Sequence, residues 1–556
     1  MLRNSPLRLM RWVAAVLGLV LVAALAAAQE GPAPLVPAGT GALPRVAGSA
    51  LQQMPVAAFA PATAPKPKTR ADVARFRARV EATLAVAGAD KGYWGVLVAD
   101  AVTGETLYAL NPRRYFVPAS NTKLFTTALA LATLGPGYRF RTTIETRGAL
   151  DRSGRLLGDL VLVGRGDPNL SNRKFPLGKE VERDGLPEKI VAELADAVVS
   201  RGIKQIDGDI VADDSYFEYD RYPSGWALED TAWRDGAPVS AIAVNDNAFD
   251  IQLRPAEREG EPAWYAIEPW VDAYRVQNEI ITGPTGSERK LGLRREPGSL
   301  LIRVWGTTPL NAGAQSLTVA VEDPAEQAAH LLKRLLEARG VRIYGAGRAR
   351  HTPDASPGAA TVLAEHTSVP LSDAVRVINK ISQNLHAELL LRAAAREKTS
   401  TPGMEAALKF AQEFFESAGI EGGDANFSDG SGLSRRNLVT PQAVVRLLQY
   451  VAAQPWAEVY RSTLPVAGED GTLADRMKNT SAAGRIQAKT GSLEHVNALG
   501  GYATTAHDAK LVFSIFGNNH TLRGRAATSV VDAICVAMVE ELGAPARRAA
   551  RRTKKK

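Results

Sequence analysis

Three short motifs follow one another along the chain, and each carries a different part of one chemistry. They are Ser120-Asn121-Thr122-Lys123, then Ser382-Gln383-Asn384, then Lys489-Thr490-Gly491-Ser492. The first holds a hydroxyl and an amine three residues apart, the second a hydroxyl and an amide, and the third a lysine beside a threonine and a glycine. A nucleophile, a base, a proton relay and a cationic grip on the substrate are what acyl transfer through a serine ester requires. Together the motifs predict a serine acyl-transfer site.

The first motif stands where a buried helix is expected to begin. Ser120 opens an apolar run, 124–134, which ends at Gly135-Pro136. Residues i and i+3 share a helix face, so the Lys123 amine can reach the Ser120 hydroxyl. Burial and nearby positive charge would lower the pKa of Lys123 enough for it to act as a base. The backbone N–H of Ser120 could also help to bind an oxyanion.

Two further S-x-x-K matches lack such a helix. Ser171 is followed by Pro176, which a helix interior does not tolerate, and Ser287 has no apolar run behind it. An isolated S-x-x-K is usually a surface serine and lysine on an ordinary helix. The other two motifs favour the catalytic interpretation for Ser120 alone.

The second motif is the only S-x-N in the chain, and the pattern predicts one helical stretch from Leu371 to Arg396 around it. The Ser382 hydroxyl could relay a proton to a leaving amine, and the Asn384 amide could hold Lys123 or the substrate. The alternative is an ordinary helix whose serine and asparagine face solvent.

The third motif is predicted at the end of a strand, 484–488, with a second strand at 498–503. Lys489 and Thr490 offer a charge and a hydroxyl for a terminal carboxylate. Gly491 would let the substrate backbone approach closely, and the N–H of Ser492 is the natural second oxyanion donor. The alternative is an exposed lysine beside a turn glycine.

With these motifs the chain resembles the class C low-molecular-mass penicillin-binding proteins, the D-alanyl-D-alanine carboxypeptidase/endopeptidase family. Four other sets of residues support the resemblance: 164–170, 213–217, 429–435, and 464–468 with 470–473. The resemblance extends from about residue 70 to about residue 542. The wide gap between Ser120 and Ser382 matches the family's large insert, and no motif position departs from the family pattern.

The resemblance implies an α+β fold, in which a penicillin-binding/β-lactamase-like catalytic domain of antiparallel sheet covered by helices is interrupted by a β-rich insert of one or two domains. The strand patterns at 93–99 and 105–110, with a closing strand at 510–516 and a helix at 526–542, agree with a domain built from both ends of the chain. The predicted limits are a signal peptide at 1–28, an Ala/Pro-rich linker at 29–68, catalytic parts at 69–138 and 370–545, an insert at 139–369 with a nested module near 217–319, and a basic tail at 546–556.

The first 28 residues have three arginines, an apolar stretch and closing alanines, which predicts export to the periplasm by a signal peptide. An uncleaved membrane anchor is the alternative. The linker holds eight prolines in 29–68 and is expected to be extended.

Composition argues against several other classes of protein. The three arginines of the signal segment and the seven basic residues of the tail carry more positive charge than the net +8 of the whole chain. The residues between these two segments are therefore not basic overall, and a nucleic-acid partner is not expected. The seven histidines are scattered and there is a single cysteine, so no metal site and no cofactor are expected. The tail suits weak contact with an anionic membrane or wall polymer, and equally a solvated terminus.

The resemblance implies a serine DD-peptidase that cleaves the terminal D-Ala-D-Ala bond of peptidoglycan stem peptides, or D-Ala cross-links, through an acyl-enzyme on Ser120. β-Lactams would acylate the same serine. From the resemblance alone, Arg435 and Asp214 are candidates for contacting the side chain of the stem peptide. Two alternatives stay open: a β-lactamase, which would normally be smaller, and a non-catalytic wall-binding scaffold.

Overall fold

The computed structural model describes residues 70–178, 183–269, 273–354 and 358–543. The predicted signal segment, linker and basic tail lie outside these residues. Within the described ranges, no helix combines the length and the apolar character that crossing a bilayer would need.

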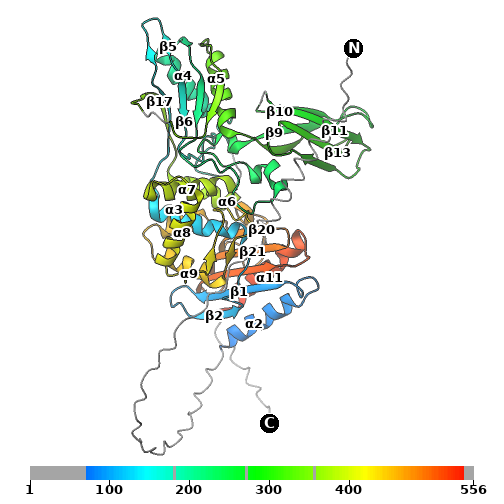
Figure 1. Cartoon of the computed structure of the whole chain (residues 1–556). Coiled ribbons are helices and arrows are strands. Elements are labelled where there is room, and N and C mark those ends of the chain that lie inside the picture. Colours follow the sequence, from blue (N-terminus) through cyan, green and yellow to red (C-terminus); the bar gives the residue numbers. More distant parts are fainter. Residues whose placement is uncertain (1–69, 179–182, 270–272, 355–357, 544–556) are drawn as a thin grey trace, which may run out of the picture. The chain divides into compact units, whose positions relative to one another are not determined.

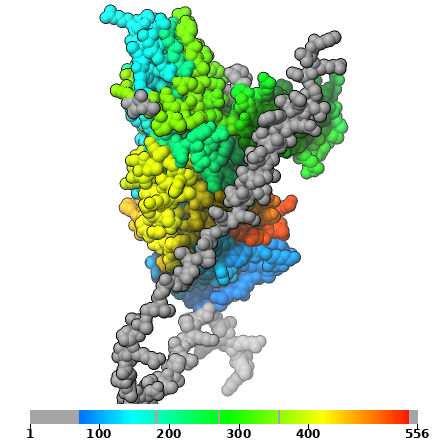
Figure 2. All heavy atoms as spheres, in the orientation of Figure 1, coloured from blue at the N-terminus to red at the C-terminus, as the bar shows by residue number. Residues whose placement is uncertain are grey.

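Both ends of the described chain build one antiparallel sheet of five strands (Figure 1). Its order is β2-β1-β22-β21-β20, and the strands are β1 (Tyr93–Asp100), β2 (Thr106–Leu110), β20 (Ile486–Leu493), β21 (Val496–Thr504) and β22 (Lys510–Asn518). Tyr93 pairs with Asn518 and Asp100 with Leu511, so an early strand lies beside a strand more than 400 residues later. In the space-filling view the blue early residues and the red late residues accordingly lie together (Figure 2).

Helices cover both faces of this sheet, so its strands are apolar on both sides. Val96 and Val98 of β1 belong to one core with α2 (Ala71–Leu84) and α11 (Arg525–Glu541). Leu97 and Ala99 belong to a second core. That core is shared with α3 (Thr122–Leu134), α6 (Leu371–Ile381), α7 (Asn384–Thr399), α8 (Met404–Ser417) and α9 (Pro441–Ala452). Alternate side chains of β1 are therefore buried in two different cores, whereas in a sheet with one exposed face every second side chain would face solvent.

Short elements complete this part of the chain. They are the 3-10 helices η1 (Ala119–Asn121) and η5 (Gly471–Leu473), helix α10 (Ala457–Thr463), and the paired strands β18 (Ala425–Asn426) and β19 (Leu438–Val439).

The insert first folds as two sheets with helices α4 (Lys189–Ser200) and α5 (Pro324–Glu337). One sheet has the order β16-β8-β6-β3-β17, with β3 (Arg141–Thr146), β6 (Leu160–Val163), β8 (Ile210–Asp213), β16 (Gly347–Arg350) and β17 (Thr361–Thr367). The other has the order β15-β7-β5-β4, with β4 (Ala149–Leu150), β5 (Arg155–Leu157), β7 (Gln205–Ile206) and β15 (Arg342–Ile343). Both helices and both sheets contribute to one apolar core.

Inside the insert, six strands form two further sheets around a core of their own. The orders are β10-β9-β14 and β11-β13-β12, with β9 (Ala248–Arg254), β10 (Trp264–Glu268), β11 (Arg275–Gly283), β12 (Lys290–Arg294), β13 (Leu301–Pro309) and β14 (Gln315–Ala320). The 3-10 helices η2 (Leu228–Ala232), η3 (Arg234–Gly236) and η4 (Val244–Asn247) precede them. The predicted limits 139–369 and 217–319 stay predictions.

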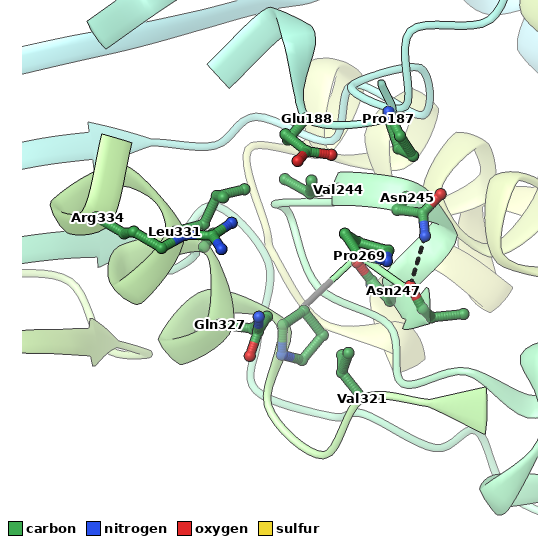
Figure 3. Close-up of a pocket in the computed structure, with 13 residues that line it drawn as sticks. Pro187, Glu188, Val244, Asn245, Asn247, Pro269, Val321, Gln327, Leu331 and Arg334 are labelled. Atoms are coloured by element: carbon green, nitrogen blue, oxygen red, sulfur yellow. Dashed lines mark hydrogen bonds between the residues drawn. The ribbon is translucent and has the colours of Figure 1, made fainter. Parts of the chain in front are cut away.

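An enclosed pocket lies within the insert, between the start of α5 and the turn that η4 makes (Figure 3). Val244, Leu331 and Pro269 are among its lining residues, and the Asn245 side chain turns back to donate to the Ala248 carbonyl at 2.7 Å. None of the residues of the three motifs line this pocket.

The predicted α+β fold class is confirmed. Most of the predicted strands and helices form within a few residues of their expected limits. Asp207-Gly208-Asp209 separates β7 from β8, which belong to two different sheets. The prediction of one continuous helix over 371–396 is wrong. The backbone of Ser382 is left-handed, so α6 ends there and α7 begins as a separate helix.

Helix α2 allows the core and the surface contributions to stability to be separated on one element. Phe76 is fully buried and packs edge-to-face on Tyr108, with ring centroids 5.4 Å apart. Arg79, on the same helix, pairs with Glu540 of α11 at 2.6 Å while its side chain stays 39% exposed.

Phe76→Ala is expected to lower the free energy of unfolding of the catalytic domain by about 3–5 kcal/mol, because it removes a buried ring and leaves a cavity. The control Arg79→Ala should cost at most about 1 kcal/mol, since exposed ion pairs contribute little. Urea unfolding of the purified chain, followed by circular dichroism, measures both. Equal losses for the two variants would contradict the packing argument.

Candidate active site

Ser120 lies in η1, the single 3-10 turn that leads directly into α3, and is half-buried. The turn needs an unusual backbone, because Ala119 has φ of +46°. Gly432 packs against it so closely that a Cβ there would lie 1.9 Å from the Ala119 carbonyl oxygen. A glycine at 432 is thus what lets a second segment support the turn that carries the serine.

Lys123 follows one turn later on α3 and is completely buried. Its Nζ lies 2.8 Å from Ser120 Oγ, and it donates to Asn384 Oδ1 and to the Ser431 carbonyl oxygen, each at 2.6 Å. The i, i+3 spacing of the first motif therefore places the amine beside the hydroxyl, and residues of two distant segments complete its surroundings.

Burial lowers the pKa of Lys123 to about 8, against the opposing effect of the carboxylates of Asp429, Glu388 and Asp235. A neutral amine has two N–H groups and one lone pair. Both carbonyl-type partners can only accept, so they use the two N–H groups, and the lone pair is left for the Ser120 hydroxyl. The three contacts of Lys123 suit both of its protonation states: the ammonium can donate to all three oxygens, and the neutral amine keeps two of these bonds and offers its lone pair to the Ser120 hydroxyl.

The second motif forms at the break between α6 and α7. Ser382 has φ of +63° and ψ of +36°, and Asn384 is the first residue of α7. The Gln383 side chain caps α7 by accepting from the Leu385 N–H at 2.9 Å. This break in the helix places Ser382 Oγ 2.9 Å from Lys489 Nζ and lets Asn384 Oδ1 accept from Lys123 Nζ. In a continuous helix, side chains two residues apart point to different sides, so the two contacts could not form together.

The third motif lies within β20 and not at its end as the sequence predicts. Lys489 is fully buried; it donates to Ser382 Oγ and to the Thr490 carbonyl oxygen, both at 2.9 Å. Burial and the neighbouring Lys123 hold the pKa of Lys489 well below its usual range. Thr490 Oγ1 donates to Thr472 Oγ1 at 2.8 Å.

Gly491 has a structural role that the sequence does not reveal, and its contact with substrate stays a prediction. A Cβ at this position would lie 2.7 Å from the Pro118 carbonyl oxygen and 3.2 Å from the Asn121 backbone nitrogen. The glycine therefore brings β20 against the backbone around Ser120, where the Asn121 side chain donates to the Lys489 carbonyl oxygen at 2.9 Å. The close approach is between two segments of the protein.

Two buried carboxylates shape the loop that supplies the Ser431 carbonyl. Glu388 of α7 accepts from the N–H groups of Gly430 and Ser431 at 2.9 and 2.8 Å, and burial, with Asp429 nearby, raises its pKa to about 7. Asp429 accepts from the Gly432 and Ser434 N–H groups at 2.8 and 2.7 Å. In the sequence, the segment 429–435 that contains this loop is marked only by its resemblance to the family. In the structure, the loop directs the Ser431 carbonyl oxygen to Lys123.

An open cleft gathers most of the predicted residues. It is lined by Ser120, Ser382, Asn384, Thr490 and Ser492 of the motifs, by Arg435, and by several residues that the sequence analysis missed: Glu229, Asp230, Arg234, Asp235, Thr472 and Arg476. The first four of the missed residues belong to the insert and carry no motif, whereas Thr472 falls in a segment (470–473) already noted for its family resemblance.

Arg435 lies at the cleft and Asp214 does not. The Arg435 guanidinium is exposed and donates to the Glu494 carbonyl oxygen at 3.3 Å. Asp214 follows β8 inside the insert, where it is 5% exposed and bound to Ser240 at 2.8 Å and His351 at 2.9 Å. The structure thus gives Asp214 a place in the framework of the insert, and we do not assign it a contact with substrate.

The insert also contacts the second motif and the helix that follows it through polar groups, of which the second set is buried. Asn384 Nδ2 donates to the Asp235 carbonyl oxygen at 2.8 Å. Two residues further on, His386 lies 3.0 Å from Asp246, which also pairs with Arg173; all three side chains are at most 6% exposed. Although burial opposes it, Arg173 and His386 hold the pKa of Asp246 well below its usual range. The start of α7 is thus fixed from the insert side.

In the described part of the chain, no group of three or more His, Cys, Asp or Glu side chains is arranged to hold a metal ion.

Comparison with known proteins places this geometry in a family. Residues 76–539 match the D-Ala-D-Ala carboxypeptidase 3 (S13) family. A D-alanyl-D-alanine carboxypeptidase of Actinomadura sp. (strain R39) is 35% identical over 94% of this chain and 96% of its own length. The D-alanyl-D-alanine carboxypeptidase DacB of Haemophilus influenzae is 28% identical over 74% of this chain and 82% of its own length.

The fold has a solved counterpart as well. The crystal structure of penicillin binding protein 4 (dacB) from Haemophilus influenzae superposes with a TM-score of 0.72 and 25% identity, covering 83% of this chain and 98% of that one. The predicted family is confirmed: the chain belongs to the D-Ala-D-Ala carboxypeptidase 3 (S13) family.

Proposed function

We propose that this family member is a serine DD-peptidase in which Ser120 takes up the acyl group of a D-Ala-D-Ala stem peptide. One observation carries the assignment of the nucleophile: the buried Lys123 amine lies 2.8 Å from Ser120 Oγ while two carbonyl oxygens occupy its N–H groups. In its neutral form, which burial favours, the amine is placed to accept the hydroxyl proton.

Acylation then proceeds by attack of Ser120 Oγ on the carbonyl between the last two D-alanines. The N–H groups of Ser120 and Ser492 stabilise the tetrahedral oxyanion. The proton that Lys123 took is relayed through Ser382, which also accepts from Lys489, to the leaving D-alanine amine, so that Lys123 is neutral again. Water hydrolyses the ester, and Lys123 again accepts a proton.

The two ends of the substrate meet different residues of the cleft. Thr490 of β20 offers a hydroxyl to the terminal carboxylate, and the carboxylate in turn favours the charged form of Lys489 beside Ser382. Arg435 is an exposed cation of the cleft that lies on the Glu494 carbonyl just after β20 and near Asp230 of the insert, and we assign it to the stem-peptide side chain. β-Lactams acylate Ser120 in the same way and leave the ester in place.

The same residues serve carboxypeptidase and endopeptidase cleavage, because the two reactions differ only in the amine that leaves. Both require an exported enzyme, which agrees with the proposed signal segment at residues 1–28 and a periplasmic location. Weak contact of the basic tail with a membrane or wall polymer remains part of this proposal.

The first prediction concerns the nucleophile. Ser120→Ala is expected to abolish both the covalent adduct with fluorescent penicillin and D-alanine release from a pentapeptide, since among the described residues only the Ser120 hydroxyl is hydrogen-bonded to the Lys123 amine. Ser287→Ala is the matched control, because it removes the serine of another S-x-x-K sequence in the insert and should leave both activities unchanged.

Intact mass and peptide mapping locate the adduct. Penicillin labelling that persists in Ser120→Ala would refute the assignment. A wild-type adduct that is released within seconds as penicilloate would favour a β-lactamase, and a folded protein with neither adduct nor turnover would favour a scaffold.

The second prediction concerns pH. Only the neutral amine of Lys123 accepts a proton, and its pKa is lowered to about 8 by burial. Below that pH the neutral fraction rises tenfold per unit, so the penicillin acylation rate constant should rise steeply between pH 6 and 8 and level off above.

Stopped-flow acylation across pH 6–10 measures this profile. Lys123→Arg should acylate at least a hundredfold more slowly with little change over that range, because a guanidinium stays charged throughout. A wild-type rate that is constant between pH 6 and 8 would exclude Lys123 as the base.

A further inference from the structure

The nested module of the insert has a groove that adjoins the wall of the cleft. It is lined by Leu228, Glu229, Ala232 and Trp233 from η2 and the residue after it, by Leu293, Arg294, Arg295 and Glu296 from the end of β12, and by Trp305 of β13. Glu229 lines both this groove and the active-site cleft. The two hollows are therefore neighbours, separated by one short helix.

Trp305 is the most unusual residue of this groove. Its side chain is 40% exposed, although an indole of this size is normally largely buried. It pairs across the sheet with Gly292, where a Cβ would lie 2.3 Å from the indole ring. The missing side chain at Gly292 lets the ring lie against the neighbouring strand, and the Arg303 guanidinium lies 5.9 Å from the ring centroid. The exposed part of the ring is therefore held in a fixed orientation beside the groove.

The charges of the groove limit what it can bind. Arg294 pairs with Glu296 at 2.6 Å, and the buried Arg295 pairs with Glu322. The lining holds two arginines, Arg294 and Arg295, and two glutamates, Glu229 and Glu296, so it carries no excess of positive charge. A polyanion is disfavoured, whereas a ligand with an apolar face and hydroxyl or amide edges finds both an aromatic platform and hydrogen-bonding partners.

We propose that this groove binds the glycan strand of peptidoglycan. A pyranose ring offers C–H groups on its face for the Trp305 and Trp233 rings, and hydroxyl and acetamido groups at its edge for Glu229 and Arg294. This proposal rests on the proposed function, because a stem peptide in the cleft is attached to such a strand, and the groove opens beside the η2 wall that borders the cleft. The nested module would then hold the polymer while the catalytic domain acts on its peptide.

The nested module also supplies a matched control. Trp264 of β10 is 53% exposed and has the Arg254 guanidinium over its ring, just as Trp305 has that of Arg303. It belongs to the other sheet of the module and does not line the groove. Trp264 thus matches Trp305 in residue type, exposure and cationic neighbour, and differs in its place.

The experiment measures binding of peptide-free glycan strands to the full chain by titration calorimetry. The strands alternate N-acetylglucosamine and N-acetylmuramic acid, and their lactyl carboxyl groups are capped as neutral amides, as the stem peptide caps them in the wall. Trp305→Ala is expected to weaken binding at least fivefold, Trp305→Phe to restore most of it, and Trp264→Ala to stay within twofold of wild type. Equal affinity of wild type and Trp305→Ala, or equal losses for both alanine variants, would overturn the proposal.

Penicillin acylation of the same preparations separates this proposal from the catalytic one. Glycan strands without peptide do not need Ser120, so binding should persist in Ser120→Ala, where acylation fails. Trp305→Ala should acylate at the wild-type rate but lose at least threefold in kcat/KM for glycan-attached pentapeptide relative to free pentapeptide. An unchanged ratio of these two kcat/KM values would also count against the groove.

Discussion

The removal of one lysine from water is the constraint on which the site depends. Burying a charged amine costs free energy, and this cost lowers the pKa of Lys123. Hydrogen bonds from its N–H groups to two oxygens that can only accept offset part of the cost. The Asn384 side chain and the Ser431 carbonyl are therefore as necessary to a usable base as the lysine itself. Neither lies near Lys123 in the sequence, so the activated serine exists only in the folded protein.

The same constraint explains why the insert and the catalytic domain share polar contacts. Asn384 must keep its oxygen on Lys123, and its amide nitrogen donates to the exposed Asp235 carbonyl of the insert. Asp429, which shapes the loop that aims Ser431, also accepts from the Trp226 indole of the insert at 3.0 Å. Asp429 is fully buried, and a buried polar group without a partner costs about 1–3 kcal/mol, so the Trp226 contact stabilises a single orientation of this carboxylate. The insert is thus part of the frame of the active site as well as a candidate polymer-binding module.

The sequence could predict those features that depend on local spacing. The i, i+3 relation between Ser120 and Lys123, the family and the two-part catalytic domain follow from short motifs and from strand patterns at both ends of the chain. The sequence could not predict the reversal at Ser382, because nothing in an Ala- and Leu-rich stretch marks a left-handed serine; only the contacts of Lys489 require it.

Tertiary placement accounts for the other differences. Gly491 is explained by the backbone of residues 118–121, which lies more than 360 positions earlier. Asp214 stands in a segment that resembles the family, yet its carboxylate is taken up by Ser240 and His351. The acidic residues of η2 and η3 that line the cleft could not be predicted from the sequence either, because they belong to no motif and are brought to the site only by the folding of the insert. Resemblance located these segments but did not say which of their side chains face the cleft.

The two buried lysines further suggest how substrate completes the activation. The pKa of Lys489 is lowered by burial and also by the nearby Lys123, because a positive charge on one amine disfavours a positive charge on the other. A substrate carboxylate beside Lys489 would favour the charged form of that lysine. The charge on Lys489 would in turn disfavour protonation of Lys123, and so hold the base neutral while the scissile carbonyl lies at Ser120. Carboxylate recognition and base activation are then one coupled equilibrium, which gives a physical reason for burying two lysines next to one serine.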